Sequence, residues 1–170
     1  MKIAEEVSPV ETEFAPLWVE AFIKGGKDRK ELFSVTNAQA SGFLPGELMP
    51  TLPVVLKALA VAAPMLLTIL RSEVTGNFLE SVKNALAVGE LLGKGRGWFS
   101  AVGGQEAEAT LAGESVYARL NEVMAKLDKE VRSLGLSQAK RDRINLVVLR
   151  LLLENPPDAT RFLGKLMEKQ

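Results

Sequence analysis

The stretch TLPVVLKALAVAAPMLLTILR, residues 51–71, is the most apolar part of the chain. Its apolar side chains fall on every side of a helix, which is typical of a helix buried at the centre of a globular protein or inserted in a membrane. Pro53 comes near its start, where proline is tolerated, and Pro64 is expected to kink it. The stretch therefore predicts one central helix that other elements must cover.

A membrane-spanning segment over residues 52–70 is the alternative, because the apolar run approaches the ~20 residues that span a bilayer. Lys57 lies within snorkelling reach of one end, where a lysine costs less than at the centre. Against insertion, the run contains many alanines, and its flanks carry neither a clear aromatic belt nor a Lys/Arg cluster. A buried helix, covered within the chain or by another subunit, is therefore favoured.

A helix is predicted to begin at Ser8, with Pro9 in its first position and Glu11 returning the second bond of a capping box. Pro16 is expected to bend or restart this helix, and the glycines at 25–26 to end it. Apolar residues at helical spacing are predicted to line one face of this helix. They are Val10, Phe14, Leu17, Trp18, Ala21 and Phe22.

The pattern between this helix and the last third of the chain is less regular outside the central stretch. Residues 28–33 predict a short charged turn of helix, and residues 34–46, rich in Ser, Thr, Asn and Gly, predict a loop. A helix is predicted over 78–92. The glycine-rich segment 93–104 is the best candidate for a boundary or hinge.

An apolar seam marks the next predicted helix. Its residues step along the sequence by four, three, four and four positions, which is close to a heptad pattern and indicates a candidate assembly surface. They are Val116, Leu120, Val123, Leu127 and Val131.

A helical hairpin with a short final helix is predicted at the C-terminus. Gly135 is expected to end the helix that carries the seam, and Ser137 to cap a second helix that runs to about Glu154. The two prolines at 156–157 break that helix, and Asp158 is expected to cap the last one, which runs through Leu166.

These elements predict an all-α protein, a helical bundle of about six to seven helices without strand-like alternation. Residues 1–95 form an N-terminal helical region, residues 96–112 a glycine-rich connection with a short helix, and residues 113–170 the C-terminal hairpin. We expect the three regions to make one compact domain overall, since 170 residues suit a single domain.

Composition excludes several kinds of chemistry. The chain has no cysteine and no histidine, so disulfides, thiolate nucleophiles and imidazole acid–base or metal chemistry are absent. Residues 89–94, GELLGK, resemble a phosphate-binding loop only superficially, because the glycine spacing is one residue short and no Ser or Thr follows the lysine. We expect no enzyme activity, no cofactor, no metal and no small-molecule ligand.

The charges balance, with 21 basic and 21 acidic residues, so no attraction of the whole protein to nucleic acid is indicated. Residues 1–110 carry 10 basic against 13 acidic side chains, and residues 111–170 carry 11 against 8. The N-terminus is acidic and lacks the apolar segment of a secretory signal, so a cytoplasmic location is expected.

The turn over residues 137–143 is the strongest hint of nucleic-acid binding. The Gly-Leu-Ser sequence at 135–137, between two predicted helices, looks like the turn of a helix-turn-helix motif. The pattern fails at two positions, because Val131 stands where that motif has a small residue and Arg141 where it has an apolar one. A glycine-rich loop with two cations and two aromatic residues adds a second candidate. The candidate contacts are Lys94, Arg96, Lys140, Arg141 and Arg143.

Three functions follow from these observations. The first is a non-catalytic helical structural or interaction protein that assembles with itself or with a protein partner. Its basis is that the predicted helices carry more apolar surface than one layer of amphipathic helices easily covers, and uncovered apolar surface indicates association. The second is a small nucleic-acid-binding subunit that uses the basic turn at 137–143. The third is a membrane-associated helical protein that inserts residues 52–70.

Overall fold

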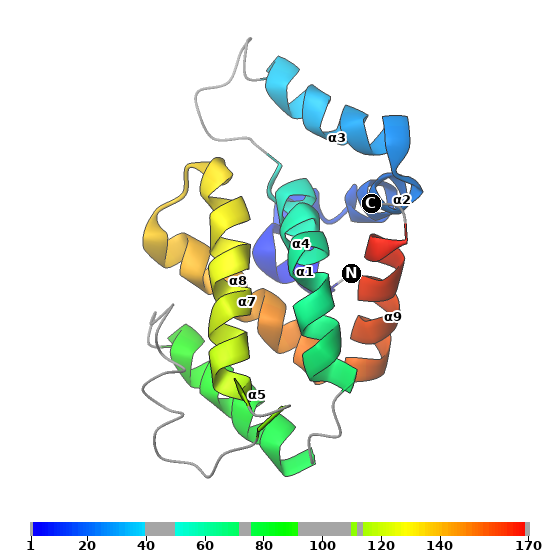
Figure 1. Ribbon diagram of the computed structural model, residues 1–170. Coiled ribbons are helices and arrows are strands. Elements are labelled where there is room, and N and C mark those ends of the chain that lie inside the picture. Colours follow the sequence, from blue (N-terminus) through cyan, green and yellow to red (C-terminus); the bar gives the residue numbers. More distant parts are fainter. Residues whose placement is uncertain (1, 40–49, 72–75, 92–109, 112–113, 169–170) are drawn as a thin grey trace.

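Figure 1 shows the computed structural model of the chain, which describes residues 2–39, 50–71, 76–91, 110–111 and 114–168. The described residues form an all-α fold, as the sequence predicts, with eight helices instead of the predicted six to seven, and with two strands of two residues each. The helices are α1 (Lys2–Val7), α2 (Ala15–Lys24), α3 (Gly26–Gln39), α4 (Thr51–Arg71), α5 (Gly76–Leu91), α7 (Val116–Val131), α8 (Gln138–Glu154) and α9 (Pro156–Met167).

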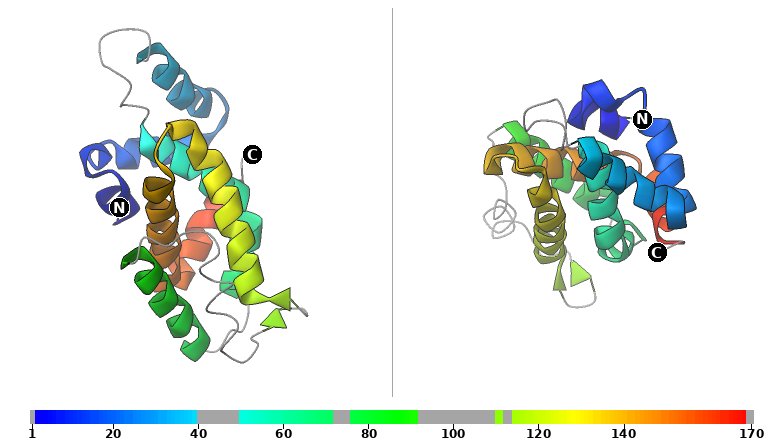
Figure 2. Two further views of the ribbon diagram at one scale, coloured as in Figure 1. Left: turned by 90° about the vertical axis from the view of Figure 1, so that its left-hand side faces the viewer. Right: turned by 90° about the horizontal axis from the view of Figure 1, so that it is seen from above.

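Four short elements complete the described chain. The 3₁₀ turn η1 (Pro9–Glu11) joins α1 to α2, and the 3₁₀ turn η2 (Arg132–Leu134) extends α7. Strands β1 (Thr110–Leu111) and β2 (Glu114–Ser115) pair antiparallel just before α7. Helices α3 and α5 lie at opposite ends of the bundle (Figures 1 and 2).

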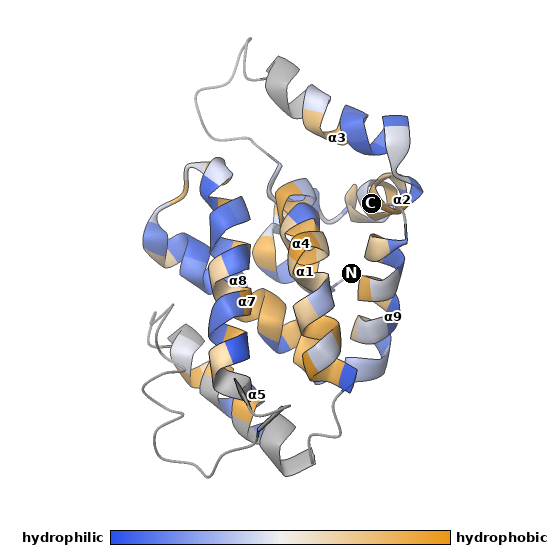
Figure 3. Ribbon diagram, viewed as in Figure 1, coloured by the Kyte–Doolittle hydropathy of each residue, from blue (hydrophilic) through white to orange (hydrophobic). Residues whose placement is uncertain are grey.

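Helix α4 is the centre of the fold and has the bounds that the sequence predicts. It packs chiefly against α7 and α9, with α2 and α1 at its N-terminal end. Figure 3 shows α4, coloured largely as hydrophobic, between α7 and α9, whereas the coloured part of α3 is mostly hydrophilic. Pro64 is accommodated inside the helix, and Thr68 Oγ1 donates a hydrogen bond to the Pro64 carbonyl at 3.0 Å.

Length and composition alone would let α4 cross a bilayer, and among the described residues no other helix meets that test. In the fold, however, 72% of its most apolar window is buried by the protein itself. Lys57 does not point into apolar surroundings, because its Nζ lies 2.8 Å from a carboxylate oxygen of Glu130 on α7. The burial favours the core interpretation of this helix.

The apolar seam of α7 lies in the core, which contradicts its assignment to an assembly surface. Leu120, Val123, Leu127 and Val131 are all buried, and α7 packs closely on α4. The side chain of the fifth seam residue, Val116, falls outside the described residues. Heptad-like spacing identified a buried face correctly, but the helix that covers that face belongs to the same chain.

Helices α7, α8 and α9 pack together at the C-terminus, as predicted. Helix α7 also packs on α4, whereas α8 also packs on α5 and α1. Both predicted caps of the turn are confirmed: Gly135 has φ 66°, and Ser137 Oγ accepts a hydrogen bond from the Lys140 amide. The last helix differs, because Asn155 rather than Asp158 is its N-cap, with Oδ1 accepting from the Asp158 amide.

The N-terminal region departs most from the prediction. An unpredicted helix, α1, precedes Ser8, and Ser8 makes no capping hydrogen bond with its side chain. Helix α2 restarts beside Pro16 and ends at Gly25, as expected. Helix α3 is longer than the predicted turn and includes residues 34–39, which were predicted as loop.

The core joins both halves of the chain. One cluster of buried apolar side chains takes residues from α1, α2, α4, α5, α7, α8 and α9. The predicted glycine-rich hinge at 93–104 lies outside the described residues. The division into regions 1–95, 96–112 and 113–170 stays a prediction.

Candidate functional site

Glu11 connects the N-terminal segment to the central helix. Its carboxylate is buried and accepts hydrogen bonds from the amides of Thr51 and Leu52, each at 2.7 Å. These two amides belong to the first turn of α4, where no carbonyl of the helix is available to accept them. The carboxylate also lies at the positive end of the helix dipole, which stabilises its charge. Glu11 therefore caps α4 across 40 residues of sequence instead of closing a local capping box.

A buried carboxylate organises the turn between α7 and α8. Asp128 is buried on α7, and its two oxygens accept hydrogen bonds from Arg141 Nε at 2.9 Å and from Arg132 Nε at 3.0 Å. Arg141 also donates from one terminal nitrogen to the Leu136 carbonyl at 2.6 Å and from the other to Gln138. The Arg141 guanidinium thus ties the end of α7, the turn and the start of α8 together.

These contacts set the ionisation of Asp128. Burial alone would raise the pKa of this carboxyl group, but hydrogen bonds from Arg141 and Arg132, together with their positive charges, outweigh burial and hold the pKa below its ordinary value. The group therefore stays charged in the folded protein at neutral pH, and it serves structure.

Arg141 consequently does not fit the role of nucleic-acid contact that the basic turn suggested. Its side chain is only 15% exposed, and its donors are directed to partners within the chain. The helix-turn-helix pattern wants an apolar residue at this position, and the structure fills it with a satisfied ion pair instead. Sequence reasoning missed Asp128, although a basic residue at an inward-facing position is a signal that an acidic partner lies nearby.

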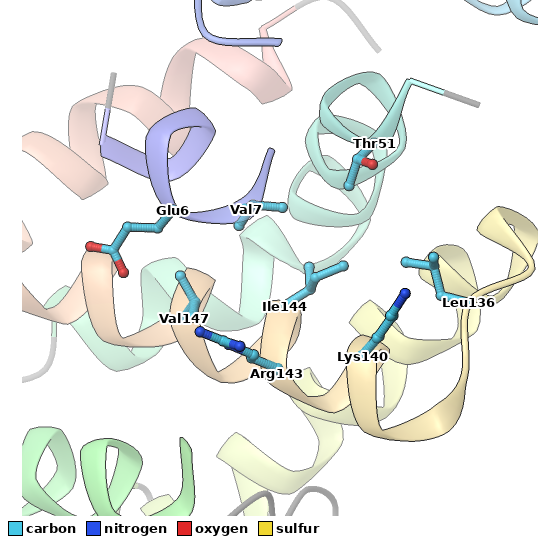
Figure 4. Close-up of a pocket in the computed structure, with 8 residues that line it drawn as sticks. All are labelled: Glu6, Val7, Thr51, Leu136, Lys140, Arg143, Ile144 and Val147. Carbon is cyan, nitrogen blue, oxygen red and sulfur yellow. The ribbon is translucent and has the colours of Figure 1, made fainter. Parts of the chain in front are cut away.

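A groove of about 330 Å³ opens beside this turn, between α1, the first residue of α4 and the start of α8. We call it the basic groove. Its lining residues, shown in Figure 4, are Glu6, Val7, Thr51, Leu136, Lys140, Arg143, Ile144 and Val147.

The basic groove carries net positive charge. Lys140 and Arg143 are exposed, and neither makes an ion pair with any residue in the part of the chain that the structure describes. The carboxylate of Glu6, at the other end, pairs with Arg150. Figure 4 shows Ile144 between the charged ends of Lys140 and Arg143 in this view, so the two cations frame an apolar surface instead of converging on one point.

A second surface feature lies on η1 and the start of α2. Val10, Phe14 and Leu17 are 78%, 51% and 63% exposed, and we call them the apolar patch. Phe14 stacks on the half-buried Trp18, with ring centroids 5.8 Å apart. The sequence predicted that these three residues line one helical face with Phe22, and in the structure only Phe22, at the far end of that set, is buried among the four.

Two of the five candidate nucleic-acid contacts are not described by the structure. Lys94 and Arg96 lie outside the described residues. Among the residues that the structure describes, no group of three or more acidic side chains is arranged to hold a metal ion. Comparisons of the chain with protein-family models, with curated proteins and with solved structures find no match.

Proposed function

We propose that this chain is a non-catalytic helical protein that works by protein–protein contact, and that the apolar patch is its contact surface. The observation that carries the proposal is the exposure of Val10, Phe14 and Leu17, which lie within eight residues of one another along η1 and the start of α2. Single exposed apolar residues are ordinary on soluble proteins. Three large exposed apolar residues within one short segment, with an aromatic ring among them, are typical of an interface.

The patch also has the rigidity that a binding surface needs. Phe22, one turn beyond it on α2, is buried and packs edge-on against Phe33 of α3, with ring centroids 6.4 Å apart. The Arg29 guanidinium lies 4.1 Å from the Phe22 ring centroid. Glu11 fixes η1 to α4 on the other side. An anchored surface loses little conformational entropy when it binds.

The test replaces the patch without touching the core. We expect the double variant Phe14→Ser, Leu17→Ser to keep the helical circular dichroism spectrum of the wild type and to lose its associations in sedimentation velocity and in crosslinking. The matched control is Val88→Ser, because Val88 is a 43% exposed residue on α5, away from the patch. If wild type, double variant and control form the same assemblies, the patch is not the contact surface.

Nucleic-acid binding at the basic turn, residues 137–143, is the second candidate function, and fewer residues support it than the sequence suggested. Of the five candidate residues, Lys140 and Arg143 are the described cations that remain exposed without an ion pair. Two phosphate contacts imply a log–log salt slope near about −2, shallower than four contacts would give. Binding to duplex DNA that survives Lys140→Ala, Arg143→Ala unchanged would exclude this turn as the contact.

Membrane insertion of residues 52–70 would require α4 to leave the core that encloses it. Exposing its buried apolar residues to solvent during that change is costly, at roughly 25 cal/mol per Å² of apolar surface. Recovery of the expressed protein in the detergent-free soluble fraction supports the core interpretation, and recovery only with detergent contradicts it. Cytoplasmic location stays a prediction.

A further inference from the structure

We infer that the partner of the apolar patch is a second copy of this chain, and that the patch of one molecule enters the basic groove of the other. The inference rests on the proposed function and names the partner that the function leaves open. Its basis is that the patch and the groove complement each other in polarity and in charge.

The apolar match comes from three apolar residues that line the basic groove, which we call its floor. Val7, Leu136 and Ile144 are each half-buried, so part of each side chain stays open to the groove. An apolar floor of this kind is covered more favourably by another apolar surface than by water. The exposed side chains of Phe14 and Leu17 provide such a surface.

The charge match comes from the borders of the two surfaces. Glu13 adjoins Phe14, is exposed, and makes no ion pair with any other described residue. Lys140 and Arg143, which border the groove, are likewise exposed and make no ion pair with any described residue. Lys140 also stands in the first turn of α8, where a cation is unfavourable because the helix dipole already places positive charge there. A carboxylate from another molecule relieves that repulsion.

A small free anion fits the groove less well than an acidic surface with apolar neighbours. Figure 4 shows Lys140 and Arg143 on either side of Ile144, so a ligand that contacts both cations also covers apolar surface between them. Glu13 beside Phe14 presents charge and apolar surface together. The match therefore favours a protein surface of the kind that this chain itself carries.

The patch and the groove are also neighbours on one molecule. Val7 lines the groove and Val10 belongs to the patch, so the two surfaces lie on adjoining parts of the α1–η1 segment. Adjacent complementary surfaces allow a pair of molecules related by a two-fold axis to exchange both contacts at once, which closes the assembly as a dimer.

Charge reversal tests the inference. One variant carries Glu13→Lys and the other carries Lys140→Glu with Arg143→Glu, and all three positions are exposed, so both variants should fold. By sedimentation equilibrium at low salt, each variant alone is expected to dimerise about 10- to 100-fold more weakly than wild type, because like charges then face each other. An equimolar mixture should dimerise like wild type, since each patch then meets a groove of opposite charge. A single chain with all three substitutions should regain self-association.

The outcomes separate this inference from the proposed function. If Phe14→Ser, Leu17→Ser abolishes dimerisation while Lys140→Glu, Arg143→Glu leaves it unchanged, the patch is a contact surface but the groove is not its partner. If both charge-reversed variants weaken but neither the mixture nor the triple variant recovers, with native circular dichroism spectra, the pairing of patch and groove is wrong. A wild-type protein that stays monomeric up to about 0.5 mM also overturns the second copy as partner.

Discussion

Replacing Glu11 with glutamine should destabilise the whole fold, although the change removes no apolar atom and lies in a short 3₁₀ turn. Two hydrogen bonds of 2.7 Å join the Glu11 carboxylate to the amides of Thr51 and Leu52. A hydrogen bond to a charged group contributes about 1.5–3 kcal/mol, and a neutral one about 0.5–1.5 kcal/mol. Glutamine keeps one neutral acceptor and turns a donor toward the second amide.

The expected loss in free energy of unfolding is therefore about 3 kcal/mol, of which the lost favourable interaction with the helix dipole is part. With an m-value of about 2 kcal/mol/M, the midpoint of urea unfolding should fall by about 1.5 M. The measurement is circular dichroism at 222 nm as a function of urea. Hydrogen exchange of the Thr51 and Leu52 amides should accelerate more than exchange at the far end of α4.

Glu122→Gln is the matched control, because it makes the same chemical change at an exposed position of α7, outside the patch and the groove, and should cost less than about 0.5 kcal/mol. Glu11→Asp should fall between the two, since its shorter side chain reaches the amides less well. Equal midpoints for the Gln variants at 11 and 122 would refute the argument that Glu11 caps α4.

Three further predictions concern stability. Asp128 has a lowered pKa in the fold, so its contribution to the free energy of unfolding is complete above its ordinary pKa of 3.8 and is lost as pH falls through the lower folded value. The variant Asp128→Asn should therefore lose that part of the dependence of stability on acid pH, which urea unfolding at about pH 2–7 measures. Leu59→Ala should cost about 2–5 kcal/mol because Leu59 is fully buried in α4, whereas Val61→Ala on the exposed side of the same helix should cost much less, both by urea unfolding. Gly135→Ala should cost about 1–2 kcal/mol because φ is 66° although the space is open, and Gly164→Ala, inside α9 and equally open, should stabilise by about 0.5–1 kcal/mol. Equal thermal shifts for the two alanine variants would contradict the assigned turn geometry.

Features that depend on neighbouring residues could be predicted from the sequence. The apolar run of residues 51–71 carries apolar side chains on every side of a helix, so its bounds and its burial at the centre of the fold were both predicted. Gly135 and Ser137 are similar, because a left-handed glycine and a capping serine act on amides and carbonyls within a few residues of themselves.

Features that depend on distant residues could not be predicted in this way. Glu11 was assigned a partner three residues away, but its acceptors are filled by amides 40 residues on. Periodicity put Val10, Phe14 and Leu17 on one predicted helical face with Phe22, but periodicity does not say whether another element covers that face. The seam that contains Leu120 shows the reverse error, since its covering helix was present in the chain and was taken for another molecule.

The position of α4 in the chain has a consequence for synthesis on the ribosome. The two helices that cover most of it, α7 and α9, are translated after it, and roughly 100 residues separate the end of α4 from the end of α9. At about 5–20 residues per second, the most apolar helix waits about 5–20 s for its last covering element. During that interval it resembles a nascent membrane segment. Chaperones and the membrane-insertion machinery should therefore compete for it, and slower translation of the second half should lengthen that competition.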